Sequence, residues 1–294
     1  MSFLTYLING ISLGGVYAII ALGYTMVYGI AKMLNFAHGD VIMIGGYLIY
    51  TAGTTWGLHP LLSILIAMTG CTILGILTEK VAYKPLRNAA SNLAVLITAI
   101  GVSYFLQNIA LLIYTANPKS FSSVVSWEGI TLADGQFKIQ GITIVTIVTS
   151  LVILIALQFF IKKTKAGQAM LAVSEDKGAA TLMGINVNRT ISLTFAIGSG
   201  LAAIAGALQC SAYPTLTPYT GAMPGIKAFV AAVLGGIGSI PGAMIGGLAL
   251  GIVEILSKRY ISTQLADAIV FAILIIVLLV KPTGLLGKNI QEKV

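Results

Sequence analysis

Charged residues are scarce in this chain of 294 residues. Asp, Glu, Lys and Arg together make up 9% of it and 57% is hydrophobic, whereas soluble domains carry about 25% charge. A soluble fold this poor in charge could not cover its surface with polar groups. Since each membrane crossing needs about 20 apolar residues, the sequence predicts an all-α, polytopic transmembrane bundle of about 8–10 spans.

A signal peptide and a disulfide framework are also missing. Residues 1–31 contain no Lys or Arg, so the basic start of a cleavable signal is absent. The first hydrophobic run is therefore expected to remain as a transmembrane helix. The two cysteines, Cys71 and Cys210, both lie in apolar segments, and this favours two buried thiols over a structural disulfide.

Motifs for catalysis and nucleotide binding are absent as well. The run from Gly284 to Asn289 comes nearest to a phosphate-binding loop, but its spacing is wrong and it lacks the hydroxyl that would hold magnesium. His38 and His59 are expected on opposite sides of the membrane, so no metal cluster is predicted. No nucleophile stands beside a base. The sequence thus predicts no catalytic residue, no metal site and no cofactor in this chain.

Ionisable residues are missing from four apolar runs, which are 6–30, 92–115, 142–161 and 191–213. Ion-coupled carriers usually keep such groups at membrane depth to bind the driving ion. The remaining candidates lie near the ends of their spans, where long side chains reach the interface easily; they are Asp40, Glu79, Lys227, Glu254 and Asp267. This distribution argues against transport driven by protons or sodium.

The apolar runs themselves define most of the spans. Besides the four runs above, 60–82 and 264–280 are clear candidates, and 36–55 is an interrupted one. The stretch 224–257 is broken by Gly235-Gly236-Ile-Gly238-Ser-Ile-Pro241-Gly242. It forms either one bent span or two half-length segments that meet at the break. One transmembrane domain over residues 1–294 accounts for the whole chain.

Basic residues between the runs set the orientation, because cytoplasmic loops are enriched in Lys and Arg. The loop with Lys80, Lys84 and Arg87 and the loop 162–190 are expected inside, and the mixed loop 116–141 outside. The net charge of +8 is explained by this role, so no nucleic-acid partner is predicted. A tail with Lys281, Lys288 and Lys293 on the inside favours two segments within 224–257, and this places Lys258 and Arg259 outside.

Residues 162–190 form a long polar island between hydrophobic segments. Small residues recur at helical spacing, Asp176 is a good N-cap and Gly184 a good C′ residue, so two short helices are predicted at about 166–174 and 177–183. They are expected either to lie on the membrane surface or to present a small-residue face to a cytoplasmic partner. The residues expected to take part in that docking are Gly167, Ala169, Ala172, Glu175, Asp176, Ala180 and Gly184.

Two further segments are candidates for the substrate pathway. The break at Gly235, Gly236, Gly238, Pro241 and Gly242 is either a simple kink or non-helical backbone that lines a water-filled cavity, since such backbone is tolerated at membrane depth only in protein or beside water. The segment with Asn35, His38 and Gly39 either aims a helix N-terminus at a carboxylate or only caps two helices near the cytoplasmic face, and the expected topology favours the caps.

A few mid-span polar residues complete the candidates. Gln107, Asn108 and Gln209 could meet the amine and carboxylate of a small cargo in an apolar chamber, but hydrogen bonding between helices explains them equally well. Tyr17, Tyr24 and Tyr28 lie on one helical stripe, which either lines the pathway or, in the favoured interpretation, contacts a neighbouring subunit or the membrane interface.

A transport pathway without energy machinery, joined to a helical cytoplasmic island, fits a subunit driven by a separate ATPase. The segments 9–29 and 33–40, the island 167–185, the run Leu234 to Gly242 and the run Lys281 to Gly287 together resemble the H-type membrane permeases of branched-chain amino acid ABC importers. The resemblance covers essentially the whole chain. One departure is Leu171, where the family usually carries Arg.

The resemblance implies several partners and a location. It implies a second permease subunit, two cytoplasmic ATPases that bind ATP and magnesium, an extracytoplasmic solute-binding protein, and a multi-pass place in the bacterial inner membrane. The expected cargo is leucine, isoleucine and valine. The alternatives are urea, amides or other neutral amino acids as cargo, a self-sufficient carrier or channel, and a scaffold without a pathway.

Overall fold

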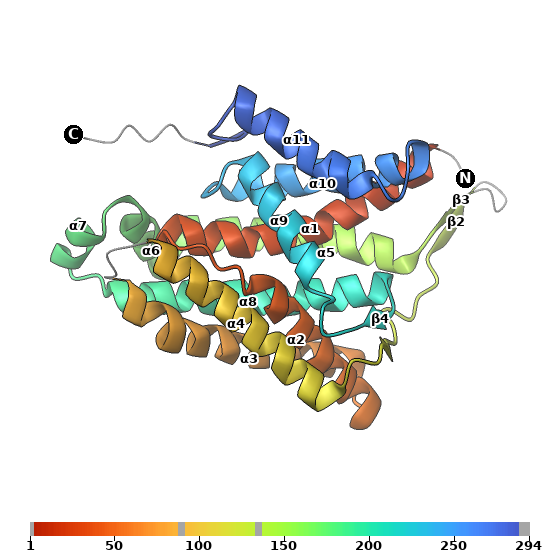
Figure 1. The fold of residues 1–294 in the computed structure, drawn as a ribbon, viewed down its shortest axis with the longest axis horizontal. Coiled ribbons are helices and arrows are strands. Elements are labelled where there is room, and N and C mark those ends of the chain that lie inside the picture. The colour runs from red at the N-terminus through yellow and green to blue at the C-terminus, as the bar shows by residue number, and fades with distance from the viewer. Residues whose placement is uncertain (1–2, 88–91, 133–136, 288–294) are drawn as a thin grey trace.

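The structure is a computed structural model that describes residues 3–87, 92–132 and 137–287. It is a bundle of helices with a few very short strands at one end (Figure 1). The helices are α1 (Phe3–Ala31), α2 (His38–Tyr50), α3 (Pro60–Thr78), α4 (Asn92–Tyr114), α5 (Gly141–Lys163), α6 (Lys165–Glu175), α7 (Lys177–Leu182), α8 (Val187–Ala212), α9 (Ala222–Gly235), α10 (Ile240–Tyr260) and α11 (Ala266–Val280). Short π- and 3-10 turns follow α2 and α3, at η1 (Thr51–Thr55), η2 (Glu79–Tyr83) and η3 (Lys84–Leu86).

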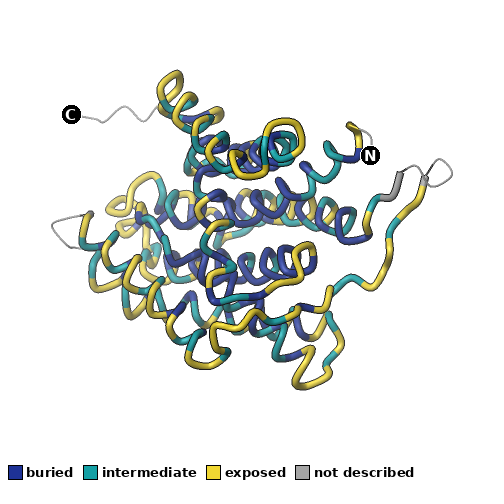
Figure 2. Tube along the Cα trace, turned by 45° about the vertical axis from the view of Figure 1, so that its right-hand side comes forward, coloured by how far each residue is buried: buried dark blue, intermediate teal, exposed yellow. Residues whose placement is uncertain are grey.

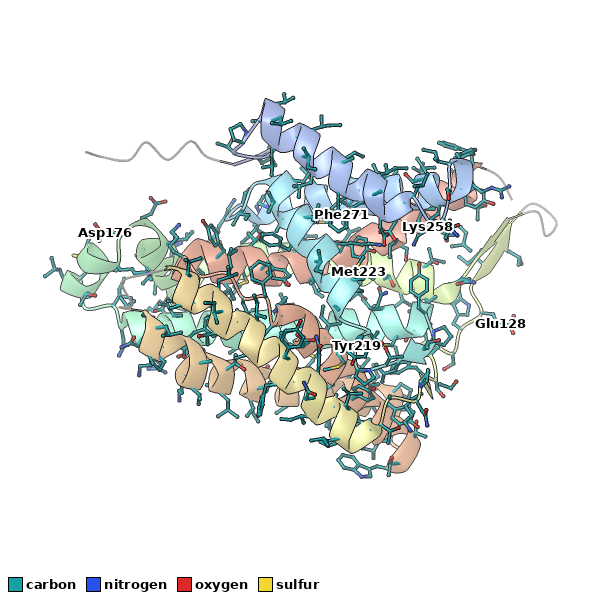
Figure 3. All side chains as sticks on the ribbon, in the orientation of Figure 1. Glu128, Asp176, Tyr219, Met223, Lys258 and Phe271 are labelled. Atoms are coloured by element: carbon teal, nitrogen blue, oxygen red, sulfur yellow. The ribbon has the colours of Figure 1, made fainter. Side chains whose placement is uncertain are left out.

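The strands form two small antiparallel pairs. β1 (Lys119–Ser120) pairs with β4 (Thr215–Leu216), and β2 (Ile130–Leu132) pairs with β3 (Phe137–Ile139). Glu128 lies beside the second pair, at the end of the bundle opposite Asp176 (Figure 3). The loop 116–141 and the loop 162–190 are therefore at opposite ends, as the distribution of basic residues predicted. Asp134 of the first loop lies outside the described residues.

Six helical segments are long and apolar enough to cross a membrane, within the described part of the chain. They are Phe3–Ala31, Pro60–Leu86, Leu93–Tyr114, Gly141–Lys163, Val187–Ala212 and Ile240–Tyr260. The apolar helices α9 and α11 are shorter, and α2 has 13 residues. The chain is a multi-pass helical membrane protein, as composition predicted.

The helices follow one order twice. A long helix (α1 or α8) leads to a segment that turns back into the bundle, then to a short helix (α2 or α9) and two more helices. The packing repeats as well, because α1 packs on α10 and α9 as α8 packs on α3 and α2. In Figure 1, α1 and α8 run in opposite directions. The two units, α1–α4 and α8–α11, are therefore inverted copies in arrangement, joined by α5, α6 and α7.

The central helices are distinguished from the outer ones by burial (Figure 2). Buried residues make up 72% of the most apolar window of α8 and 56% of that of α1, but 22% of those of α3, α4 and α5. Apolar side chains that remain exposed on the outer helices suit a lipid environment, where no polar face is needed. The first helix of each unit, α1 or α8, thus lies at the centre, and α3, α4 and the connecting helix α5 lie outside.

Glycine spacing explains the close contact of α1 with α10. A Cβ atom on Gly14 would lie 2.7 Å from Leu248 Cα, and one on Gly251 would lie 2.1 Å from the Gly14 nitrogen. Glycines four residues apart allow backbones to approach in this way. Gly10 and Gly14 in α1 and Gly247 and Gly251 in α10 are such pairs, and all four lie at this contact.

The break in 224–257 is the turn of a helical hairpin. α9 ends at Gly235, α10 begins at Ile240, and the two helices pack against each other. The turn lies by the C-terminal end of α1, since a Cβ on Gly29 would come within 3.3 Å of Gly238 Cα. Neither one bent span nor two half-length segments describes it fully, because α10 has 21 residues and α9 has 14.

The hairpin decides the position of the C-terminal region. The nitrogens of Leu285 and Leu286 donate to the carbonyl oxygens of Leu234 and Gly235 at 2.8 and 2.9 Å, so the chain after α11 lies at the turn. Arg259 lies at the other end of α10, 5.1 Å from the centre of the Tyr6 ring in α1. This is the arrangement expected from a tail on the inside; Lys288 and Lys293 lie outside the described residues.

Candidate functional site

The polar island folds into α6 and α7, close to the predicted boundaries. Thr164 is the N-cap of α6, and its hydroxyl accepts a hydrogen bond from the Gly167 nitrogen at 3.0 Å. Asp176 is the N-cap of α7, because its Oδ1 accepts from the nitrogens of Gly178 and Ala179 at 2.7 and 2.9 Å. Such caps satisfy backbone donors that a helix leaves free at its start.

Gly184 ends α7 as predicted. It has a φ of +81°, a left-handed conformation that favours glycine. Its nitrogen donates to the Thr181 oxygen, and the Ile185 nitrogen donates to the Ala180 oxygen, both at 3.0 Å. This pair of bonds is the Schellman arrangement, which satisfies the last carbonyls of a helix.

The outward face of the island differs from the predicted one. Gly167 and Ala180 are buried, and Ala169 and Ala172 are half-buried. A Cβ on Gly167 would lie 2.3 Å from the Phe160 oxygen, so the small residues let α6 fold back tightly on α5. The prediction that the small residues face a partner is therefore wrong for Ala180, and Gly167, which was expected to take part in docking, lies against α5. The exposed large apolar residues are Leu171, Leu182 and Met183, and the last two are 90% and 82% exposed.

Lys177 links the island to α1. Its Nζ donates to the carbonyl oxygen of Ala31, the last residue of α1, at 3.0 Å. A cation at a helix C-terminus interacts favourably with the helix dipole. Burial lowers the pKa of the Lys177 amine below its usual value, and the nearby charges of Arg87 and Lys32 lower this pKa further. Lys177 therefore connects the start of α7 to the end of α1.

The segment Asn35 to Gly39 turns back into the bundle. His38 is 1% exposed, and its ring lies edge-on to the ring of Tyr24 with a centroid distance of 4.9 Å. Asn35 Oδ1 accepts a hydrogen bond from the Tyr83 hydroxyl at 2.8 Å. The expectation that Asn35 and Asp40 cap helices near the cytoplasmic face is wrong, because Ala37 is the N-cap of α2 and no side chain caps it.

Asp40 holds α2 against α4. Its Oδ1 accepts a hydrogen bond from Gln107 Nε2 at 2.9 Å, and this nitrogen also lies 3.3 Å from the Ser103 hydroxyl. Asp40 and Gln107 are both buried. Gln107 was a candidate for contact with cargo, and here it serves contact between helices. Asn108 bonds within its own helix, to the Tyr104 oxygen at 2.7 Å.

The two short helices meet at their N-termini. A Cβ on Gly221 would lie 1.8 Å from the Gly39 oxygen, and one on Gly39 would lie 2.6 Å from the Gly221 oxygen. The backbones of the two re-entrant segments therefore touch directly. Gly39 lies at this junction, whereas the predicted pathway residues Gly235, Gly236, Gly238, Pro241 and Gly242 lie at the hairpin turn. The structure does not bring these two predicted groups together.

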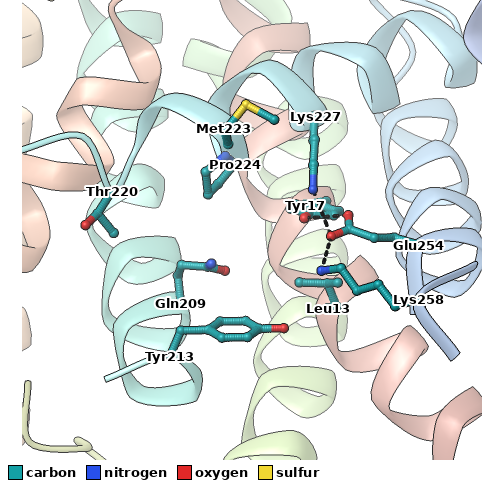
Figure 4. A pocket seen from close by; sticks show the side chains of 10 residues that line it. All are labelled: Leu13, Tyr17, Gln209, Tyr213, Thr220, Met223, Pro224, Lys227, Glu254 and Lys258. Carbon is teal, nitrogen blue, oxygen red and sulfur yellow. Dashed lines mark hydrogen bonds and ion pairs between the residues drawn. The ribbon is translucent and has the colours of Figure 1, made fainter. Parts of the chain in front are cut away.

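A cavity of about 240 Å³ lies beside the start of α9, between α1, α8 and α10 (Figure 4). Apolar and polar side chains share its wall. Its lining residues are Leu13, Tyr17, Gln209, Tyr213, Thr220, Met223, Pro224, Lys227, Glu254 and Lys258. None of these belongs to the predicted pathway set, although Tyr17 and Gln209 were noted as polar candidates.

Four charged side chains form a linked cluster at this cavity. Glu254 Oε1 accepts from Lys227 Nζ at 2.8 Å and from Lys258 Nζ at 2.6 Å, and Glu254 Oε2 accepts from the Tyr17 hydroxyl at 2.8 Å. Lys227 Nζ also lies 2.6 Å from Asp267 Oδ1. Buried charges persist in a membrane protein when they are paired in this way. From the sequence Lys227, Glu254 and Asp267 were expected to reach the interface from the ends of their spans; the four-residue spacing of Glu254 and Lys258 was the one available signal for a pair.

Comparisons with known proteins place the chain in a family. The family described as branched-chain amino acid transport system, permease component, matches residues 6–278. The permease protein LivH of a high-affinity branched-chain amino acid transport system from Salmonella typhimurium is 46% identical, with 99% of this chain and 98% of the relative covered. BraD from Pseudomonas aeruginosa is 41% identical over the same shares. A probable LivH from Methanocaldococcus jannaschii is 30% identical, with 92% and 88% covered.

Proposed function

This chain belongs to the branched-chain amino acid transport permease family, and we propose that it is the membrane permease subunit of an ATP-driven importer for leucine, isoleucine and valine. The match over residues 6–278 carries this conclusion. The relatives are named as permease proteins of transport systems, and the chain is accordingly a transport subunit and not an enzyme. It provides half of a pathway whose other half comes from a second permease.

The ATPase that drives the importer docks on α6 and α7 in this proposal. Leu171, Leu182 and Met183 form an exposed apolar surface, here called the docking surface, on a loop that carries several Lys residues. A lipid-facing surface would not need capped helices that project from the end of the bundle (Figure 1). ATP and magnesium are bound by the two ATPase subunits, and the docking surface receives their movement.

Movement of the docking surface reaches the bundle by two contacts. Gly167 lies against Phe160 and Ile161 of α5, and Lys177 holds the end of α1. α1 in turn packs on α10 through glycine contacts without intervening side chains. Since backbones in direct contact transmit displacement with little slack, α1 can carry the motion to the cavity at Tyr17.

The remaining parts of the proposal concern delivery and location. A solute-binding protein delivers the amino acid at the end that carries β2, β3 and Arg259, opposite the docking surface. The basic residues Lys80, Lys84 and Arg87 and the Lys residues of the island share the docking end, which fits a cytoplasmic side in a bacterial inner membrane.

The test is co-purification of the full importer from its native membrane with the doubly substituted chain Leu182→Glu, Met183→Glu. Two carboxylates on the docking surface should remove the ATPase and abolish leucine uptake while the second permease still co-purifies. Ile261→Glu is the matched control, since Ile261 is an exposed apolar residue at the opposite end of the bundle. Retention of the ATPase by the double variant would disprove this docking surface.

A further inference from the structure

We propose that the cavity between α1, α8, α9 and α10 binds the substrate amino acid as a zwitterion, with Gln209 at its ammonium group and Lys258 at its carboxylate. This inference rests on the proposed function and adds to it a substrate site. It is carried by three independent features of the cavity, which are a vacant acceptor, spare ammonium donors and a neutral charge balance.

Gln209 supplies the vacant acceptor. It projects from α8 into the cavity (Figure 4) and is 9% exposed. Its Oε1 atom is buried without a hydrogen-bond partner among the residues that the structure describes. A buried acceptor left in this state costs about 1–3 kcal/mol, which is tolerated best where a donor arrives during function. An amino acid's ammonium group carries three N–H donors and suits this oxygen.

Lys258 supplies the donors on the opposite wall. It reaches from α10 toward the space that Gln209 faces (Figure 4). Its side chain is 32% exposed and its Nζ atom pairs with Glu254 Oε1. An ammonium group has three donors, so Lys258 keeps donors for a carboxylate from solution. Lys227 is enclosed more tightly, at 8% exposure, and already lies between Glu254 and Asp267.

The charge balance selects for a neutral ligand. Lys227 and Lys258 are matched by Glu254 and Asp267 in one linked cluster. A ligand with a net charge would leave one charge uncompensated beside the enclosed Lys227 and Glu254, and this is unfavourable. A zwitterion adds one charge of each sign and keeps the balance.

The rest of the lining fits an aliphatic side chain. Leu13, Met223 and Pro224 contribute apolar surface, and small-ligand sites commonly combine such walls with a few fixed polar groups. The volume of about 240 Å³ lies somewhat below the range of roughly 300–1,000 Å³ for drug-sized ligands, as expected for a small amino acid. Lys258 lies next to Arg259, at the end opposite the docking surface, so this site meets substrate as it arrives.

Protection of an introduced cysteine tests the site in the full importer reconstituted in liposomes. Thr220 lines the cavity, and Thr220→Cys is labelled with a membrane-impermeant maleimide in the presence of leucine, 4-methylpentanoate or 3-methylbutylamine. Leucine should slow labelling, and the two analogues, each lacking one charged group, should not. Cys71 and Cys210 are buried, and the importer without Thr220→Cys gives the background.

Substitutions of Gln209 test whether this side chain binds the ammonium group of leucine. In the Thr220→Cys importer, Gln209→Leu should raise the half-protecting leucine concentration about tenfold or more, the usual effect of losing a bond to a charged group. Gln209→Asn keeps an amide acceptor without adding a charge and should retain more protection than Gln209→Leu, which separates loss of contact from loss of folding. Asn108→Leu is the matched control, because Asn108 is an exposed mid-span amide outside the cavity.

The outcomes separate this site from the proposed function. In one set of results the importer transports leucine, but leucine leaves the labelling rate unchanged or protects the Gln209→Leu variant equally well. Either result would disprove the substrate site and leave the proposed importer function intact. If the unmodified chain neither imports leucine nor retains an ATPase, the importer is wrong, whatever the labelling rate shows.

Discussion

The two inverted units use the same backbone arrangement for different purposes. In the first, α1 leads through residues 32–37 to α2, and two buried polar side chains there bond to protein groups of other elements, Asn35 to Tyr83 and Asp40 to Gln107. In the second, α8 leads through residues 213–221 to α9, where Lys227 joins a charged cluster beside a cavity.

The difference shows that two copies of one backbone arrangement can serve different functions in the same chain. A short helix that starts inside a bundle leaves backbone donors and polar side chains in the interior, and these need partners. The first unit supplies neutral partners from α4 and η2 and becomes a packed support. The second unit pairs charges across α9, α10 and α11 and leaves a cavity beside them, which is where we propose that the substrate binds.

The largest effect is expected where the two units touch. In Gly221→Ala the new Cβ would lie 1.8 Å from the Gly39 oxygen, and the obstacle is backbone that a side-chain rotation cannot remove. The cost should exceed the roughly 1–3 kcal/mol of ordinary overpacking. We expect almost no folded protein, measured as the monodisperse fraction extracted from the membrane in mild detergent.

Gly101→Ala is the control for this substitution. Gly101 lies in α4, and a Cβ there meets nothing within 4 Å, so its variant should be extracted like the unmodified chain. A normal yield of folded Gly221→Ala would show that the two units do not depend on their direct contact.

The second largest effect is expected at the buried carboxylates, where substitutions of Glu254 and Asp40 should differ in how much they destabilise the protein. Glu254→Gln leaves Lys227 and Lys258 with Asp267 as their remaining carboxylate in the cluster, and breaking a buried pair costs about 3–5 kcal/mol. Asp40→Asn keeps an acceptor for Gln107 and should cost about 1 kcal/mol or less. Thermal unfolding in detergent should therefore show a much lower midpoint for Glu254→Gln.

A double substitution sharpens this comparison. Lys227→Met combined with Glu254→Leu leaves Lys258 and Asp267, one charge of each sign, and should recover much of the stability, because apolar replacement of a buried pair is often neutral. Equal midpoints for Glu254→Gln and Asp40→Asn would remove the proposed difference between the units.

The smallest expected effect comes from the same substitution made once in each unit. Tyr17→Phe removes a hydrogen bond to the Glu254 carboxylate, and Tyr83→Phe removes one to the Asn35 amide. Bonds to charged groups contribute about 1.5–3 kcal/mol and neutral ones about 0.5–1.5 kcal/mol. Unfolding midpoints should fall further for Tyr17→Phe, and the reverse order would place the more strongly held polar group in the first unit.

Local patterns were predicted well from the sequence. The boundaries of α6 and α7, the N-cap Asp176 and the C′ residue Gly184 follow from groups within a few residues of one another. The glycine pairs of α1 and α10 are likewise visible in the sequence, since small residues four apart create a flat helix face whatever the partner.

Properties that depend on distant partners were predicted poorly. The sequence shows that Gly235 to Gly242 cannot form a regular helix, but not that the chain reverses there and meets Gly29 and Leu286. Likewise, the small residues of the island were expected to face a partner. The sequence does not show that the end of α5 packs against Gly167, so the burial of this residue could not be predicted.

The sequence by itself determined the membrane class, most of the spans, the capped helices of the island and, through its family resemblance, the transport role. These depend on composition and on interactions within one or two helical turns. Only the tertiary structure decided that α2 and α9 begin inside the bundle, that Lys227, Glu254, Lys258 and Asp267 form one cluster, and that Gln209 faces a cavity. Each of these needs side chains from helices far apart in the chain, and their meeting depends on the packing of the whole bundle.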